Sequence, residues 1–549
     1  MKPAALLMAA LATGPALAQV VSPGALQQLR IDEEERRRQI ERIEQQRAAE
    51  PKVEVPPLQP AVREDPNAVR FLVREIRFSA SEIFSAEELR DFARPYEGRE
   101  QTLSALQGLA AAINEAYRKR GVVTAQALIP PQNVSSGVVE IRLVEGRLGS
   151  ILLQGNTTTA GDYITDRISM KSGDLVDLPG LEEDLLRFNR TNDVQLQAEL
   201  KPGTSFATTD LKVDASEPPR HLLRTFVDNN GSRTTGEGRG GMTYFNHSLF
   251  GYRDEFSLST TQSGGQQSYS VSYAVPFNRS GGRATLAYYL DYTQIRHGSF
   301  ASLDITGESR STIFSLRQPL YVSRQSQIDL LGGAKTRRND NWISDVFINR
   351  TETVDGNLGA EFQHADAGGY WVGSYSYTGG SSKLNNHREY WYGRGWLRRQ
   401  QTLADQWSAV GALSFQNTGR KLLPSSEQFI IGGEGTVRGY PVGTYSADIG
   451  YTLSAELHHP MGSTTLGDGV TQMLASGFFF VDFGHVRPYR PPNSTLRNYE
   501  QLTSAGWGFS TAIGKHVTTK TTLSYMFDKV PDETPSRYSL MFQLVANIF

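Results

Sequence analysis

The chain has 549 residues, of which 21% are charged and 38% hydrophobic, and a formal net charge of −2 at pH 7. A near-neutral balance without a basic cluster argues against a nucleic-acid partner. There is no cysteine, which excludes disulfides and thiolate chemistry.

The N-terminus reads as a signal peptide over residues 1–18. Lys2 precedes the apolar run 4–12, and the small residues of 16–18 suit cleavage before Gln19. The chain is therefore expected to leave a bacterial-type cytoplasm. No later run approaches the roughly twenty apolar residues that a membrane-spanning helix needs.

Residues 19–50 are dense in Glu, Arg and Gln from position 23 onward and have helix-forming composition. Their apolar residues make no continuous stripe, so the helix either bridges solvent or sits in a wet cavity. A mobile, partly helical tail is the alternative that composition leaves open. Prolines at five positions then mark an extended linker over residues 51–69.

Residues 70–146 have the pattern of a small α/β module in the order strand, helix, helix, strand, strand. Ser85 and Glu88 form a capping-box signal for the first helix. The expected elements are a strand at 71–78, a long helix at 103–119, and strands at 122–129 and 138–144.

The same order recurs over residues 147–217, which makes an internal repeat of roughly seventy residues. The expected elements are a strand at 149–153, helices at 162–170 and 181–189, and strands at 194–200 and 209–215. Edge strands such as 122–129 or 194–200 can pair with an incoming extended peptide. A plain pair of spacer domains is the alternative.

Residues 218–549 alternate between an apolar, aromatic-rich face and a small, polar face. Tyr269, Val271 and Tyr273, for example, alternate with serines. Strands of about ten residues with this pattern are typical of an outer-membrane β-barrel, and about sixteen can be counted. A soluble sandwich also alternates, but its strands are usually shorter.

The connections between these strands alternate in length. Short connections are expected at 250–252, 278–282, 367–368 and 514–517, and long ones at 298–308, 336–350 and 483–504. Short turns at one end and long loops at the other match the periplasmic and external faces of a barrel. By this parity, residues 432–447 lie in the sixth external loop.

That loop holds five glycines between residues 432 and 443, which allow a compact, strained conformation with Arg438 at its tip. A dinucleotide fingerprint is disfavoured, because the glycine spacing is wrong by one residue and a strand-like segment follows. In residues 478–484, Phe479, Val481 and Phe483 share one face and Asp482 lies on the other. If the apolar face meets lipid, Asp482 points inward and needs a partner, for which Arg438 is the candidate.

Taken together, these features resemble the two-partner secretion transporters of the haemolysin and haemagglutinin type, whose superfamily also includes the barrel-assembly proteins. The resemblance covers nearly everything after the signal. The superfamily's sixth-loop motif is matched by Val437, Arg438, Gly439 and Tyr440, and its barrel-wall motif by Phe480, Asp482 and Gly484.

The resemblance implies a fold and a function. Two polypeptide-transport-associated (POTRA) domains, at 70–146 and 147–217, would bind a large secreted partner polypeptide, such as an adhesin or a haemolysin, in the periplasm. The barrel at 218–549 would export it across the outer membrane of a Gram-negative-type bacterium. The helix near 26–47 would plug the pore at rest, and Arg438 would pair with Asp482 inside it. Outer-membrane lipid would surround the barrel, and the barrel-assembly machinery would insert it.

No catalytic residue, metal site or cofactor is expected. Residues 333–336 lack the glycine before lysine that a P-loop needs, and His458 and His459 are adjacent rather than at ligand spacing. The chain is therefore not expected to be an enzyme. Two other functions stay open, an insertase that assembles other barrels and a passive porin.

Overall fold

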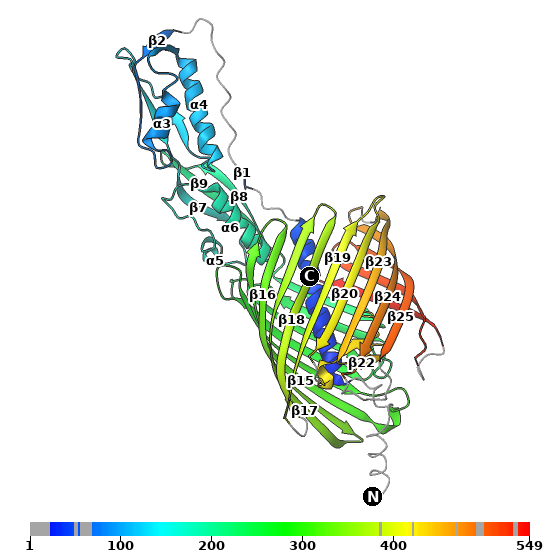
Figure 1. The fold of residues 1–549 in the computed structure, drawn as a ribbon. Coiled ribbons are helices and arrows are strands. Elements are labelled where there is room, and N and C mark those ends of the chain that lie inside the picture. The colour runs from blue at the N-terminus through cyan, green and yellow to red at the C-terminus, as the bar shows by residue number, and fades with distance from the viewer. Residues whose placement is uncertain are drawn as a thin grey trace. The chain divides into compact units, whose positions relative to one another are not determined.

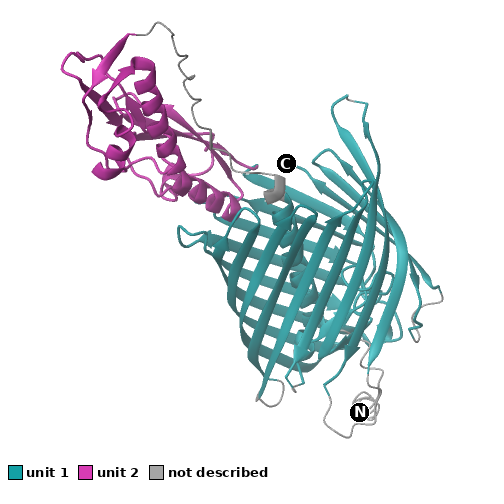
Figure 2. Ribbon diagram, turned by 45° about the horizontal axis from the view of Figure 1, so that its top comes forward, with its two compact units in different colours: residues 1–48, 219–549 teal, residues 49–218 magenta. Residues whose placement is uncertain are grey.

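A computed structural model describes residues 22–48, 53–54, 69–383, 387–419, 422–467, 469–489, 499–530 and 536–549. The predicted signal peptide and most of the predicted linker lie outside the described residues. The chain divides into two compact units, residues 1–48 with 219–549 and residues 49–218 (Figure 2).

The first α/β module of the smaller unit has the predicted helices. The capping box at Ser85 and Glu88 is present, with each side chain bonded to the other residue's backbone N–H. The long helix has its predicted bounds and ends at Lys119, with Arg120 as its C-cap and Gly121 following at φ 80°. The elements are β2 (Arg70–Val73), β3 (Glu75–Phe78), α3 (Ala86–Ala93), β4 (Arg99–Thr102), α4 (Leu103–Lys119), β5 (Gln126–Leu128) and β6 (Val138–Val144).

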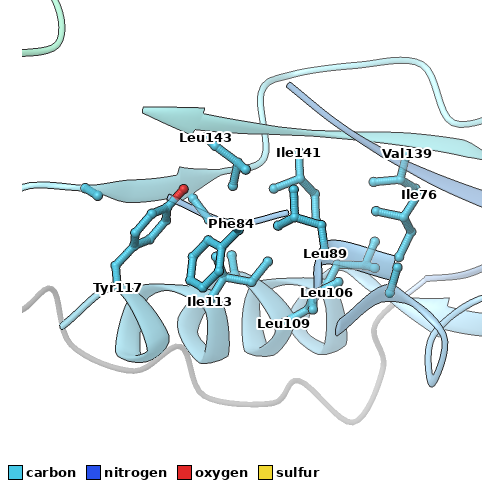
Figure 3. Close-up of a cluster of buried hydrophobic side chains, with 14 of the residues drawn as sticks. Ile76, Phe84, Leu89, Leu106, Leu109, Ile113, Tyr117, Val139, Ile141 and Leu143 are labelled. Atoms are coloured by element: carbon cyan, nitrogen blue, oxygen red, sulfur yellow. The ribbon is translucent and has the colours of Figure 1, made fainter. Parts of the chain in front are cut away.

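Two strand predictions in this module were wrong in extent. The single strand expected at 71–78 is broken at Arg74, and its halves pair with different partners, β2 with β4 and β3 with β6. The strand expected at 122–129 is confined to β5. β3, β6 and β5 form one sheet in that order, and side chains of α3 and α4 pack on it to make the core (Figure 3).

Leu109 lies in this core, and replacing it by alanine is expected to destabilise the module by about 2–5 kcal/mol, because a buried cavity is left. Its side chain is 1% exposed, whereas Leu103 on the same helix is 51% exposed. Leu103→Ala is therefore the matched control, with an expected change within about 0.5 kcal/mol. Pulse proteolysis of the full-length protein in urea measures both values, and equal midpoints for the two variants would contradict this core assignment.

The second module has the predicted order of strand, two helices and two strands, without a counterpart of β4 between its helices. Its elements are β7 (Arg147–Gln154), α5 (Gly161–Thr165), α6 (Leu178–Thr191), β8 (Gln195–Pro202) and β9 (Thr208–Ser216). The helix predicted at 162–170 ends early, at Thr165, although Ile168 and Met170 beyond it are still buried in the module's core.

A pairing that the sequence did not suggest covers one edge of the second module. The two-residue strand β1 (Val53–Glu54) lies parallel to β8, with Val53 opposite Ala198 and Glu54 opposite Glu199. The sheet order is β1-β8-β9-β7. The expectation that residues 194–200 form a free edge is therefore wrong, because part of that edge is already paired.

The larger unit contains a closed barrel of sixteen strands, the number predicted, in which each strand pairs antiparallel with its neighbours and β10 pairs with β27. The strands are β10 (His221–Asp228), β11 (Arg239–Asn246), β12 (Glu255–Ser263), β13 (Gln266–Pro276), β14 (Arg283–Gln294), β15 (Ile305–Val322), β16 (Ser326–Ile343), β17 (Val346–Asp366), β18 (Gly369–Lys383), β19 (His387–Thr402), β20 (Ser408–Thr418), β23 (Ile449–Thr465), β24 (Gln472–Arg487), β25 (Glu500–Ile513), β26 (Val517–Met526) and β27 (Tyr538–Asn547). Among the described residues, no helix combines the length and apolarity needed to cross a bilayer.

The two faces of the barrel wall differ as the alternation predicted. Tyr269 and Val271 of β13 are exposed on the outside, whereas Ser268 of the same strand faces the lumen and is buried. Phe479 and Val481 are likewise exposed, while Asp482 is buried. An apolar exterior and a polar interior are what a barrel in lipid requires.

One long loop was predicted wrongly. β16 and β17 continue through most of residues 336–350 and are joined only by Ser344 and Asp345. Both turn residues have positive φ, 48° and 64°, as a tight hairpin turn requires. The predicted loops at 298–308 and 483–504 are shorter than expected, because the connections run over 295–304 and 488–499. They leave the same end of the barrel as the connection after β20.

Candidate functional site

The connection between β20 and β23, residues 419–448, folds into the barrel. It contains the short helix η3 (Ser425–Glu427) and a hairpin of β21 (Phe429–Ile431) and β22 (Tyr445–Ala447). Phe429, Ile431, Val437 and Tyr440 are buried in one cluster with Val486, Leu502 and Met526 of the wall. We call this connection the sixth loop.

Arg438 at the tip of the sixth loop is bound by Asp482 of β24. Its Nε and Nη2 donate to the two carboxylate oxygens of Asp482 at 2.7 Å each, and its backbone N–H donates to the same carboxylate at 3.1 Å. Both side chains are almost fully buried, at 3% and 1% exposed. A planar guanidinium suits this two-pronged contact, and the pairing compensates two charges removed from water.

Further groups complete the surroundings of Arg438. Its Nη1 donates to Glu456 at 2.5 Å and its Nη2 to the Ser454 hydroxyl at 3.0 Å, both on β23. The ring of Phe480 lies 3.8 Å from the guanidinium carbon, within cation–π distance. The tip of the loop is therefore held by two adjacent strands.

The other predicted site residues lie in the same place. Tyr440 donates from its hydroxyl to the Thr503 carbonyl of β25 at 2.8 Å. Gly439 has φ 92°, and a side chain there would meet Ser524 of β26. Gly484 of β24 lies against Val437, whose methyl group would be 2.7 Å from an added Cβ. The structure thus brings all seven residues of the two motifs together.

The helix α2 (Pro23–Ala48) runs through the lumen of the barrel (Figure 1). Near its start, Arg30 donates to Asp291 of β14 at 2.7 Å. Near its end, Tyr370 of β18 donates to Glu44 at 2.9 Å. The helix therefore spans the barrel from the end with the long connections to the end with the short ones.

Polar contacts dominate between α2 and the wall. Arg394 donates to Asp32 at 2.5 Å, and Gln39 donates to Glu361 at 2.7 Å. The partners come from several strands around the lumen. This distribution accounts for the missing apolar stripe, because a helix with a polar wall on every side needs no apolar face.

The helix also contacts the sixth loop. A side chain added at Gly435 would collide with the carboxylate of Glu33, and Leu26, Leu29 and Glu33 line a small cavity together with residues 432–435. The loop and the helix therefore pack side by side in the lumen.

Several residues around this site were missed from the sequence. Glu456 lies on the lumen side of β23, where strand parity would have found it. Lys335 and Arg337 are buried in the middle of β16, although residues 336–350 were predicted to be a long loop and residues 333–336 were considered only as a possible P-loop. Glu427 of η3 could not be predicted, because the residues next to it in the sequence have no periodic pattern that indicates a buried carboxylate.

Comparison with sequence families gives two matches. The family described as haemolysin secretion/activation protein ShlB/FhaC/HecB matches residues 207–511, more than half of the chain. The POTRA domain of ShlB type matches residues 71–146.

Curated relatives cover most of the chain. The outer membrane transporter CdiB of Dickeya dadantii is 25% identical over 460 residues, 77% of this chain and 78% of the relative. The heme/hemopexin transporter protein HuxB of Haemophilus influenzae is 24% identical over 459 residues, with the same coverage. The hemolysin transporter protein ShlB of Serratia marcescens is 23% identical over 434 residues, 73% of each chain.

Solved structures share the fold. CdiB from Escherichia coli matches with a TM-score of 0.66 at 19% identity, over 95% of this chain and 98% of that one. BamA from Haemophilus ducreyi lacking POTRA domains 1–3 matches with a TM-score of 0.54 at 14% identity, over 87% and 100%. At these identities the likeness extends to the fold alone.

Proposed function

The chain belongs to the haemolysin secretion/activation protein family of outer-membrane transporters, and from this premise we propose how it exports its partner polypeptide. The barrel lies in the outer membrane and the POTRA domains lie in the periplasm. We propose that α2 closes the pore at rest, that the sixth loop is anchored in the lumen, and that the partner passes through once α2 has left.

The position of α2 carries this proposal. A helix that runs along the lumen and bonds to strands near both ends lies in the path that an extended polypeptide would take. Its contacts are hydrogen bonds and ion pairs, such as Arg30 to Asp291 and Asp32 to Arg394, rather than a large apolar interface. Water and a polar cargo can replace such contacts one at a time, which suits a plug that must come out.

For the sixth loop, the buried pair of Arg438 and Asp482 supports a role as a fixed lumen element. Removing one partner of a buried pair is far more costly than removing an exposed one. The loop would thereby stay on β23 and β24 when α2 breaks its own contacts and leaves the lumen. The roles of Val437, Gly439, Tyr440, Phe480 and Gly484 are to seat the loop closely against the wall.

The partner polypeptide is proposed to dock on the first POTRA domain along β5, which is one of the two outer strands of its three-stranded sheet. An extended segment can add to such an edge through its backbone hydrogen bonds. β8 is the weaker candidate, because Val53 and Glu54 already pair with part of its edge. A secreted adhesin or haemolysin-like protein fits this mode of docking.

Other components follow from the same proposal. Outer-membrane lipid would contact the apolar exterior, and the barrel-assembly machinery would insert the barrel. Export would need no chemical step, so the chain would not act as an enzyme, and folding of the partner outside the cell would drive transport forward.

The likeness of the fold to BamA keeps an insertase as the second candidate. Comparing the proteins of culture medium and cell surface with and without this chain separates the two functions. Loss of one large polypeptide, with other outer-membrane proteins unchanged, is the expected result. Loss of many barrel proteins would contradict export as the main role and favour the insertase. A passive porin would change neither set.

A further inference from the structure

A buried carboxylate in the sixth loop has no part in the pair of Arg438 and Asp482. Glu427 closes η3, near the point where the loop leaves β20, and it is 0% exposed. Lys335 Nζ donates to one of its oxygens at 2.8 Å and Arg337 Nη1 to the other at 2.9 Å. The Tyr392 hydroxyl donates to it at 2.8 Å. These three partners come from β16 and β19.

The backbone at the same point is also held by the wall. Arg337 donates to the Ser426 carbonyl at 3.1 Å, and the Glu427 carbonyl accepts from Arg394 at 3.2 Å and from Gln416 at 3.0 Å. Side chains of β16, β19 and β20 thus hold η3 on one stretch of wall. The tip of the loop is held on another stretch, formed by β23 and β24.

The plug helix shares the same cations. The side-chain oxygen of Gln28 accepts from Lys335 Nζ at 3.2 Å and from Arg337 Nη2 at 2.6 Å. The loop and the helix therefore use one pair of wall cations at the same time.

The charges of this cluster balance only with Glu427 present. Lys335 and Arg337 supply two positive charges, and Glu427 and Asp355 supply two negative ones, with Lys335 Nζ 3.5 Å from Asp355. All four side chains are buried. Removing the charge of Glu427 leaves one uncompensated positive charge away from water, which is strongly unfavourable.

We propose that Glu427 is a second positioning residue of the sixth loop, which anchors its first part to β16 and β19 as Arg438 anchors its tip to β24. Because Gln28 binds the same two cations, the anchor also links the loop to the plug helix. This inference rests on the proposed function of the loop and the helix, and it adds a residue that neither motif contains.

The absence of other cysteines allows a single reporter thiol in the loop. Thr436→Cys places it between the two anchors, and its rate of reaction with a membrane-impermeant maleimide on intact cells reports how firmly the loop is held. Glu427→Gln should raise that rate by about tenfold or more, since bonds to a buried charge are lost. Glu427→Asp keeps the charge and should stay within about threefold of the parent.

Glu434→Gln is the matched control. Glu434 lies in the same loop and is paired by Lys520 at 2.6 Å, but the two side chains are 23% and 37% exposed. Glu434→Gln should change the labelling rate by no more than about twofold. Heat-modifiability of the barrel verifies insertion of each variant. If Glu427→Gln fails to insert, Tyr392→Phe removes one hydrogen bond to the same carboxylate and should raise labelling about threefold.

If the labelling rate of Glu427→Gln, or of Tyr392→Phe in its place, equals that of the parent, the proposal that Glu427 is a second anchor is wrong. Arg438→Ala in the same assay separates this failure from a wider one. If Arg438→Ala raises labelling while the Glu427 variant does not, the loop proposal stands and only the second anchor is lost. If neither variant raises it, the proposed anchoring of the loop fails as well.

Discussion

Replacing Arg438 by alanine is expected to reduce export of the partner polypeptide by on the order of a hundredfold, while the barrel remains inserted. The physical reason is the buried charge of Asp482, since removing one member of a buried ion pair costs about 3–5 kcal/mol. The barrel itself does not depend on Arg438, because its sixteen strands are joined by backbone bonds that exclude the sixth loop. Secreted partner in the medium and heat-modifiable barrel in the membrane are the two readouts.

Two further variants sharpen this test. Arg438→Lys keeps the charge but cannot make the two-pronged contact. Its level of export should therefore lie between that of the parent and that of Arg438→Ala. Lys520→Ala is the matched control, because Lys520 also pairs with a carboxylate of the sixth loop but is partly exposed. Export by this variant should stay within about twofold of the parent level. Parent-level export by Arg438→Ala would remove the anchored loop from the mechanism.

Strand parity was sufficient to find the partner of Arg438. Because side chains alternate along a strand, outward Phe479 and Val481 require inward Asp482, and an inward carboxylate at membrane depth requires a cation. Two glycines of the motifs, Gly439 in the loop and Gly484 on β24, lie at close approaches between the loop and the wall. A contact can be predicted from sequence where strand alternation places a charge at membrane depth, because leaving that charge unpaired is energetically costly.

Lys335 and Arg337 escaped the same reasoning for a physical reason. Parity applies only to segments recognised as strands, and the polar run 336–350 resembles a loop. A strand that extends beyond the lipid has no apolar face to reveal it, and the turn at Ser344 and Asp345 contains no glycine. The contacts of Glu427 with Lys335 and Arg337 could therefore not be predicted without the register of β16.

Long-range pairings were also out of reach. The helix α2 contacts wall residues between 183 and 378 positions away, such as Arg224 and Ser414. The pairing of Val53 with Ala198 is only two residues long. Composition could place the helix in a wet cavity but could not identify its partners, because a polar lumen supplies hydrogen-bonding groups on every side.

Linking α2 covalently to the barrel wall is expected to block export, because the helix could then no longer leave the lumen. The helix starts against β16, where a Cβ added at Gly24 would lie 2.9 Å from the Asn339 Cγ. Because Cγ is one bond from Cβ, cysteines at these two positions are within the reach of a disulfide. The chain has no other cysteine, so Gly24→Cys with Asn339→Cys can form only this bond within the molecule.

Export by this double variant under oxidising and reducing conditions is the most direct measurement of whether the helix must leave. With the disulfide formed, export should fall by on the order of a hundredfold, and added reductant should restore it. The two single-cysteine variants should export normally under both conditions, which controls for the substitutions themselves. Parent-level export while the disulfide is quantitatively present would contradict the account, because the partner would then pass a barrel whose helix is still held at the wall.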